Sequence, residues 1–182
     1  MLTPADAERL LADAELVCSA EKSALAIRRM AAEITARLAT RNPLVLLVMN
    51  GALMFAGDLL RQLAFPLEVD YLQVSRYRDA TRGGELNWLV EPRGAVAGRA
   101  VLVLDDILDE GVTLAAVRQR LLAQGAAEVL LAVFADKALG HEKPLRADFV
   151  GITVPNRYVF GYGMDIRGAW RHLPAVYALK ET

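Results

Sequence analysis

Short apolar runs alternate along the chain with amphipathic stretches, and this pattern predicts an α/β domain. Three runs are almost wholly apolar, as strands buried on both faces of a parallel sheet are: residues 44–48, 101–104 and 129–134. Less uniform runs predict further strands at 67–74, 86–90, 148–154 and 176–179. Apolar positions at helical spacing predict helices over 24–38, 53–63 and 114–121. The elements therefore alternate in the way that places helices over a mostly parallel sheet.

Capping residues mark several of these boundaries. Thr3 and Pro4 suit the N-cap and first position of a helix, which we expect to run to about Val17. Asn42 and Pro43 end the helix over 24–38, and Gly125 suits the C-cap of the helix that starts near residue 114. The lone cysteine at position 18 is then expected in or near a helix.

The apolar run 101–104 is followed by two carboxylates, a short polar turn and a helix. The turn contains Asp109, Glu110, Gly111, Val112 and Thr113. In open α/β sheets, ligands bind beyond the carboxyl ends of the strands, and helix N-termini attract phosphate. Asp105 and Asp106 are placed to accept hydrogen bonds from ribose hydroxyls, directly or through hydrated Mg²⁺, and Asp109 is placed to act as a base. This order favours a phosphorylated sugar as the ligand over a plain acidic turn.

Three further segments have a functional and an ordinary interpretation. Asn50 and Gly51 end the strand 44–48, where they form either a ligand-facing turn or a simple strand–helix connection. Lys137 follows the strand 129–134, and a lysine there is either a ligand donor or merely solvated. The polar segment 75–85 is either a hairpin loop or a lid that excludes water from a reactive intermediate.

Composition limits the class of protein. The 182 residues fit one domain over 1–182, with 54% hydrophobic and 24% charged residues, so disorder is not expected. The net charge of −1 indicates no general nucleic-acid or membrane surface. A single cysteine excludes an internal disulfide, and no signal peptide or membrane span is evident, so we expect a cytoplasmic protein. His141 and His172 are expected at the surface.

The stretch 101–114 resembles the phosphoribosyl pyrophosphate (PRPP) signature of type I phosphoribosyltransferases. The resemblance departs at Glu110, where the family more often has Thr or Ser, and at Val112, where some members have Lys. It implies a ribose-phosphate site made of the two carboxylates and the turn that follows them. Its members are Asp105, Asp106, Asp109, Glu110, Gly111, Val112 and Thr113.

The segment 155–165 is similar to the base-binding segment of the hypoxanthine-guanine branch of that family. The resemblance implies that Tyr158 stacks on the purine, that the Val159 backbone pairs with the base edge, and that Lys137 donates to the 6-oxo group. The aromatic residues Phe160 and Tyr162 are expected in the core instead.

The same resemblance implies sites for pyrophosphate and metal. It places Asn50 and Gly51, with an unusual cis peptide, and Arg171 against the pyrophosphate. Asp165, together with Asp105 and Asp106, would hold Mg²⁺. Ser75 and Tyr77 stand where the family's closing loop carries a Ser-Tyr type pair, although Arg76 separates them here.

The resemblance as a whole implies a type I phosphoribosyltransferase fold with a mostly parallel sheet, flanking helices, a small hood and a mobile loop. The implied activity is purine salvage: a pentosyltransferase that joins hypoxanthine or guanine to PRPP and releases IMP or GMP and pyrophosphate. Asp109 would take the proton from N7, adenine would be a poor substrate, and a homodimer or homotetramer is expected.

Two alternatives belong to other classes. A regulatory protein of this fold would sense PRPP or nucleotide without chemistry, which the presence of Asp109, Lys137 and Asp165 together argues against. A nucleotide kinase is disfavoured because the sequence contains no G-x-x-x-x-G-K-[ST] loop.

Overall fold

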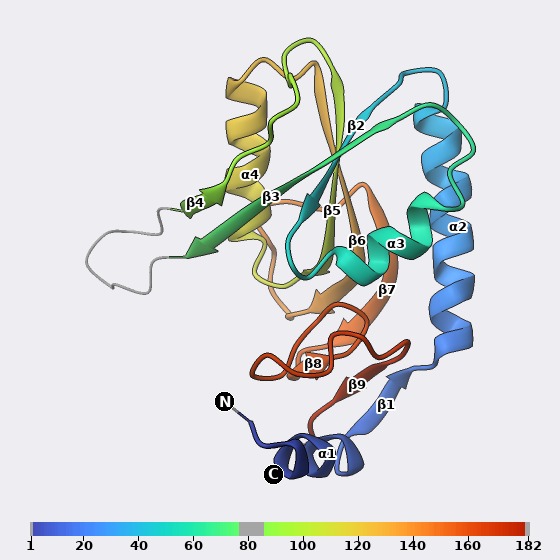
Figure 1. Cartoon of the computed structure of the whole chain (residues 1–182), viewed down its shortest axis with the longest axis vertical. Coiled ribbons are helices and arrows are strands. Elements are labelled where there is room, and N and C mark those ends of the chain that lie inside the picture. Colours follow the sequence, from blue (N-terminus) through green and yellow to red (C-terminus); the bar gives the residue numbers. More distant parts are fainter. Residues whose placement is uncertain (1, 77–85, 181–182) are drawn as a thin grey trace.

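A six-stranded sheet forms the centre of the molecule (Figure 1). The computed structural model describes residues 2–76 and 86–180. The strands are β2 (Leu44–Val48), β3 (Glu68–Arg76), β4 (Leu86–Val90), β5 (Ala100–Leu108), β6 (Glu128–Ala138) and β7 (Phe149–Pro155). Their order is β4-β3-β2-β5-β6-β7, and every neighbouring pair is parallel except β3 and β4. The predicted mostly parallel sheet is therefore confirmed.

Helices cover both faces of this sheet because its central strands are apolar on both faces. Alternate side chains of a strand point to opposite faces. Val45 and Leu47 of β2 join the core under α2 (Ala20–Leu38) and α3 (Leu53–Leu60). Leu44 and Leu46 join the second core, to which α4 (Val112–Ala123) contributes Leu114, Val117 and Leu121. The apolar faces that the periodicity predicted for 24–38 and 114–121 are thus the buried ones.

A smaller antiparallel sheet lies beyond the carboxyl ends of the large sheet's strands (Figure 1). It has the order β1-β9-β8, with β1 (Glu15–Cys18), β8 (Val159–Phe160) and β9 (Val176–Ala178). The N-terminal helix α1 (Pro4–Ala12) lies beside it, and the Trp170 indole donates to the Ala7 carbonyl across 2.8 Å. This layer is the hood that the family resemblance implies, and it faces the edge where ligands bind in such sheets.

The expectation of a helix up to Val17 is wrong. The helix starts as predicted, with the Thr3 hydroxyl accepting from the Asp6 amide at 3.2 Å, but it ends at Ala12. Residues Glu15–Cys18 instead pair with β9, more than 150 positions away in sequence, because that pairing satisfies their backbone groups and buries Cys18. Cys18 directly precedes Ser19, the N-cap of α2.

Strands β5 and β6 are longer than their apolar runs. Parallel pairing continues past the apolar residues, through Ile107 with Ala135 to Leu108 with Asp136. Asp105 and Asp106 are therefore inside β5, and Lys137 is inside β6, rather than in the turns that follow. The glycine expected to end α4, Gly125, has a φ of +90° just beyond the helix.

No helix in the part of the chain that the structure describes combines the length and apolar character needed to cross a bilayer.

Phe134 is a test of the core under α2 and α3. Its side chain is fully buried, with its ring centroid 6.1 Å from that of Phe55 and 4.2 Å from that of Tyr162. We expect Phe134→Ala to lower the free energy of unfolding by about 3–5 kcal/mol, because it leaves a cavity at the meeting point of both sheets. Denaturant titration would measure this.

The control is Leu122→Ala on α4, whose side chain is 46% exposed and which should change stability by less than about 0.5 kcal/mol. Similar small effects of both substitutions would contradict the assigned core.

Candidate active site

Two adjacent carboxylates near the end of β5 form the centre of the site. Asp106 is only 8% exposed, and its amide donates to the Asp105 carboxylate at 3.0 Å. Burial raises the pKa of both carboxyls, and for Asp105 the neighbouring Asp106 charge raises the pKa further. Buried carboxylates need partners, so a ligand that offers hydroxyl donors or positive charge is favoured here.

Two glycines allow the chain to approach Asp106 closely. A Cβ at Gly51 would lie 2.3 Å from the Asp106 carboxylate, and a Cβ at Gly163 would lie 2.2 Å from the Gly51 carbonyl oxygen. The turn that contains Asn50 and Gly51 follows β2, the strand next to β5, and the peptide bond between Met49 and Asn50 is cis. The structure therefore brings the Asn50–Gly51 turn, the Gly163 loop and the carboxylate pair together.

Arg171 links the hood to these carboxylates. Its guanidinium donates to the Gly163 carbonyl at 2.7 Å, is ion-paired with Asp165, and lies 3.9 Å from the Asp106 carboxylate. The proximity of Arg171 works against burial and lowers the pKa of Asp106 relative to what burial alone would give. Asp165 also accepts from the Gly168 amide at 2.7 Å, so the carboxylate is held by its own loop.

Tyr158 and Val159 present a flat ring and a strand edge. Tyr158 is 51% exposed, and its hydroxyl donates to the Asp165 carbonyl at 3.1 Å. Burial of the hydroxyl, followed by the Asp165 charge, raises the pKa of Tyr158, so the hydroxyl stays protonated at neutral pH. The Leu179 amide donates to the Tyr158 carbonyl at 3.0 Å. Because hydrogen bonds alternate in an antiparallel pair, the Val159 peptide groups face the outer edge of β8.

Phe160 and Tyr162 are core residues, as predicted. Both are buried, and the Tyr162 hydroxyl donates to Asp58 at 2.8 Å.

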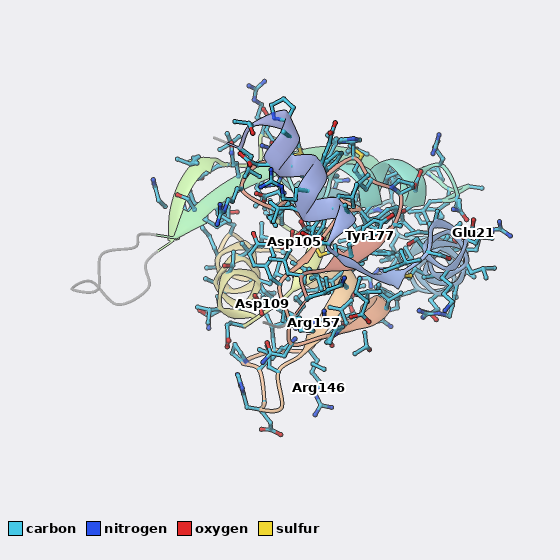
Figure 2. All side chains as sticks on the ribbon, turned by 90° about the horizontal axis from the view of Figure 1, so that it is seen from below. Glu21, Asp105, Asp109, Arg146, Arg157 and Tyr177 are labelled. Carbon is cyan, nitrogen blue, oxygen red and sulfur yellow. The ribbon has the colours of Figure 1, made fainter. Side chains whose placement is uncertain are left out.

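Asp109 and Lys137 meet immediately beyond the last positions at which β5 and β6 pair with each other. Leu108 and Asp136 are the final pair in register, and one residue further on the Lys137 ammonium lies 3.0 Å from the Asp109 carboxylate. The Lys137 side chain is 13% exposed, whereas that of Asp109 is 51% exposed. The predicted base and the predicted donor to a purine are thus neighbours. Figure 2 shows Asp109 and Asp105 on the same side of the molecule as α4.

The turn after Asp109 leads directly into α4. Gly111 is the N-cap with a φ of +77°, and the helix begins at Val112, so its first amides belong to the predicted phosphate turn. Thr113 lies in the first helical turn. The Glu110 carboxylate faces His141 at 3.2 Å.

Sequence reasoning missed His141 and Lys143 as neighbours of this turn. His141 is at the surface, as expected, but it contacts Glu110. The Lys143 ammonium lies 2.7 Å from the Leu108 carbonyl and 2.5 Å from the Asp136 carboxylate. No local motif marks either residue as a neighbour of the turn, because the His141–Glu110 and Lys143–Leu108 contacts join positions 31 and 35 apart in sequence.

Of the two predicted loop residues, the structure describes only Ser75, which is not brought into this cluster. Ser75 is an exposed residue of β3, which is separated from β5 by β2. Tyr77 lies outside the described residues.

Comparison with known proteins shows the family to which the chain belongs. Residues 17–167 match the phosphoribosyl transferase domain family. The hypoxanthine-guanine-xanthine phosphoribosyltransferase of Tritrichomonas foetus is 36% identical over 159 residues, which are 86% of each chain. The hypoxanthine-guanine phosphoribosyltransferase of Bacillus subtilis is 32% identical, over 91% of this chain and 93% of its own.

Bifunctional TilS/HprT proteins, such as that of Listeria innocua, are 39% identical over 155 residues. The chain spans about a quarter (24%) of the length of these relatives.

Solved structures of phosphoribosyltransferases have the same fold as this chain. A hypoxanthine-guanine-xanthine phosphoribosyltransferase superimposes with a TM-score of 0.85 at 32% identity, over 93% of this chain and 99% of its own. A hypoxanthine phosphoribosyltransferase from Staphylococcus aureus superimposes with a TM-score of 0.88 at 25% identity, over 94% of this chain and 95% of its own. The chain belongs to the phosphoribosyltransferase family, in its hypoxanthine-guanine branch.

Gly163 tests the close approach of the hood loop to β5. Its φ is +105°, and a Cβ there would overlap the Gly51 backbone. We expect Gly163→Ala to lower the free energy of unfolding by about 2 kcal/mol or more, from backbone strain and overlap. Thermal or urea unfolding would measure the change.

The matched control is Gly57→Ala, inside α3, where an added Cβ meets nothing within 4 Å. Alanine is the better helix former, so that variant should gain up to about 1 kcal/mol. Equal stability of the two variants would be inconsistent with the described packing at Gly163.

Proposed function

We propose that this chain catalyses transfer of the 5-phosphoribosyl group from PRPP to hypoxanthine or guanine, giving IMP or GMP and pyrophosphate. The observation that carries the proposal is the position of the Asp109–Lys137 pair, at the ends of β5 and β6, with the half-buried Asp105 and the buried Asp106 nearby on β5. A proton acceptor, a donor for a 6-oxo group and two ribose-binding carboxylates then border one site.

The two carboxylates near the end of β5 are placed to bind the ribose. Asp105 and Asp106 would accept hydrogen bonds from the two ribose hydroxyls, which supplies the partners that buried carboxylates need. Their charge would also oppose the positive charge that develops on the sugar as its bond to pyrophosphate breaks.

The turn before α4 suits the 5′-phosphate. The first amides of the twelve-residue helix are oriented toward that turn, and Gly111 allows the phosphate to approach the backbone. Thr113 stands in the first helical turn, and Val112 contributes its amide. Glu110 adds negative charge here, but its carboxylate is paired with His141.

Asn50, Gly51 and Arg171 suit the pyrophosphate. The guanidinium of Arg171 has forked donors that match such an anion, and its ion pair with Asp165 holds it at the site.

The carboxylates also suit Mg²⁺, which typically binds one or two carboxylates together with substrate phosphates. Among residues 2–76 and 86–180, no three side chains of the His, Cys, Asp or Glu type converge on one metal position. Asp105, Asp106 and Asp165 would contribute carboxylate oxygens to an ion that is also held by the phosphates of the substrate. Such an ion neutralises charge on the leaving pyrophosphate.

The purine would lie against Tyr158, whose half-exposed ring offers an apolar face. The Val159 peptide groups face outward at the edge of β8 and would pair with the edge of the base. Lys137 would donate to the 6-oxo group. An ammonium has three donors, so Lys137 can keep Asp109 as one partner while it binds the base. A 6-amino purine would place a donor against a donor, so adenine should be a poor substrate.

The chemical step then follows from these positions. N9 of the purine forms the bond to C1 of the ribose as the bond from C1 to pyrophosphate breaks. Asp109 accepts the proton from N7, and pyrophosphate leaves with the bonding electron pair. Help of this kind from a general base is typically worth about 10²–10⁴-fold in rate.

Several expectations extend this proposal. We infer that residues 1–182 act as one phosphoribosyltransferase domain in the cytoplasm and assemble as a homodimer or homotetramer. A closing role for the segment with Ser75 and Tyr77 also stays a prediction.

Asp109→Asn tests the proposed base. The amide cannot accept the N7 proton, so we expect kcat with hypoxanthine and with guanine to fall by about 10²–10⁴-fold. A spectrophotometric assay with PRPP and Mg²⁺ would offer hypoxanthine, guanine, xanthine and adenine in parallel.

Asp13→Asn, an exposed carboxylate beyond the end of α1, is the matched control and should leave kcat unchanged. PRPP binding by wild-type protein without turnover of any base would overturn the proposal in favour of a sensor.

Metal removal gives a second test. Because the metal shell is expected to form only with substrate, Mg²⁺ alone should shift the melting temperature by less than about 1 °C, whereas PRPP with Mg²⁺ should raise it by several degrees. EDTA should abolish turnover without unfolding the protein. A large stabilisation by Mg²⁺ alone would indicate a preformed metal site instead.

A further inference from the structure

The connection between β6 and β7 contacts the turn before α4 at three successive places. His141 faces Glu110 at 3.2 Å, and Lys143 reaches the Leu108 carbonyl at 2.7 Å. Pro144 stands 3.4 Å from the place where a Cβ at Gly111 would lie. Figure 2 shows this connection, which carries Arg146, on the same side of the molecule as Asp109. The connection therefore forms an outer wall behind the proposed phosphate turn.

Lys143 is the residue of this wall that joins both strand ends. Its side chain is 10% exposed, and its ammonium is shared between the Leu108 carbonyl and the Asp136 carboxylate at 2.5 Å. These are the last two residues in register between β5 and β6. A cleft of about 710 Å³ opens beside the connection, and Leu108, Asp136 and Lys143 are among the residues that line it. The polar contacts of Lys143 therefore lie in the wall of this cleft.

The two residues that follow this last pair are Asp109 and Lys137. Their side chains lie 3.0 Å apart. Lys137 is still paired with Val154 of β7, whereas Asp109 lies beyond the end of β5, so the sheet holds Lys137 but does not hold Asp109. The Lys143 ammonium bonds to the residue immediately before each of them. Charge-assisted hydrogen bonds are stronger than neutral ones. The two bonds of the Lys143 ammonium would therefore restrain the backbone just before Asp109 and just before Lys137.

We propose that Lys143 is a positioning residue for Asp109 and Lys137, holding the base and the purine donor at their working separation. The inference rests on the proposed function. It does not place Lys143 against substrate: the residue acts through the backbone at Leu108 and through the carboxylate of Asp136.

Lys143→Met tests the inference, because it keeps the side-chain length but removes the charge and all donors. We expect kcat with hypoxanthine to fall about tenfold or more and the KM for hypoxanthine to rise, since small displacements of reacting groups have large effects on rate. Lys143→Arg keeps charge and donors and should retain most of the wild-type kcat. Lys22→Met, at an exposed position in α2, is the control and should not change either constant.

A double-mutant cycle separates positioning from general damage. If Lys143 acts through Asp136, then Asp136→Asn lowers kcat in the same direction, and adding Lys143→Met to it lowers kcat by much less than the product of the single effects. Wild-type kcat and KM in folded Lys143→Met, or fully multiplicative effects in the cycle, would overturn the inference. Where Lys143→Met yields no folded protein, Asp136→Asn alone decides: unchanged kcat and KM reject the role.

Hydrogen–deuterium exchange distinguishes failure of this inference from failure of the proposed function. In folded Lys143→Met, amides of residues 105–114 should exchange faster than in wild type, whereas those of residues 20–38 should not change. An inactive wild type would refute the proposed function, and the exchange result would still decide the positioning role: unchanged protection over 105–114 rejects it.

Discussion

The rest of the structure depends on a pair of adjacent carboxylates near the end of an apolar strand, the buried Asp106 and the half-buried Asp105. Val101 to Leu104 fix β5 between two helical layers, and continued pairing with β6 carries Asp105 and Asp106 into the same protected environment. Such groups are unfavourable without partners. Arg171, 3.9 Å from Asp106, supplies part of the compensation, and a sugar with hydroxyl groups and a bound cation would supply the remainder.

The hood completes the surroundings of Asp106 with residues that the large sheet does not contain. Arg171, Asp165 and Gly163 reach Asp106 and one another from the loop between β8 and β9. Tyr158 is attached to the same loop through its bond to the Asp165 carbonyl. A single loop thus links the groups proposed for the pyrophosphate with the ring proposed to stack on the purine.

The opposite side of the site is organised by the point where two strands stop pairing. Asp109 and Lys137 lie one residue beyond the last pair between β5 and β6. Lys137 is still held by β7, but Asp109 has left the sheet. Lys143 of the β6–β7 connection bonds to Leu108 and Asp136, the residues just before them, and is the group proposed to hold Asp109 against Lys137. Such a contact would let an exposed turn keep its relation to a donor on the neighbouring strand.

The sequence by itself determined the layer architecture and the location of the chemistry. Continuous apolar runs such as 44–48 and 101–104 are typical of parallel strands that helices cover on both faces. Residues 105–113 follow one of these runs, at the carboxyl end of the strand, where ligands bind in such sheets. Tertiary structure decided what depends on distant partners. Glu15–Cys18 continues a helical pattern locally but becomes a strand because β9 pairs with it. The Asp109–Lys137, Glu110–His141 and Leu108–Lys143 contacts, and the meeting of Gly51 with Gly163, join segments whose proximity only the completed sheet and hood create. Local propensity holds no information about such contacts, because their geometry is set by the register of strands and the path of loops between them.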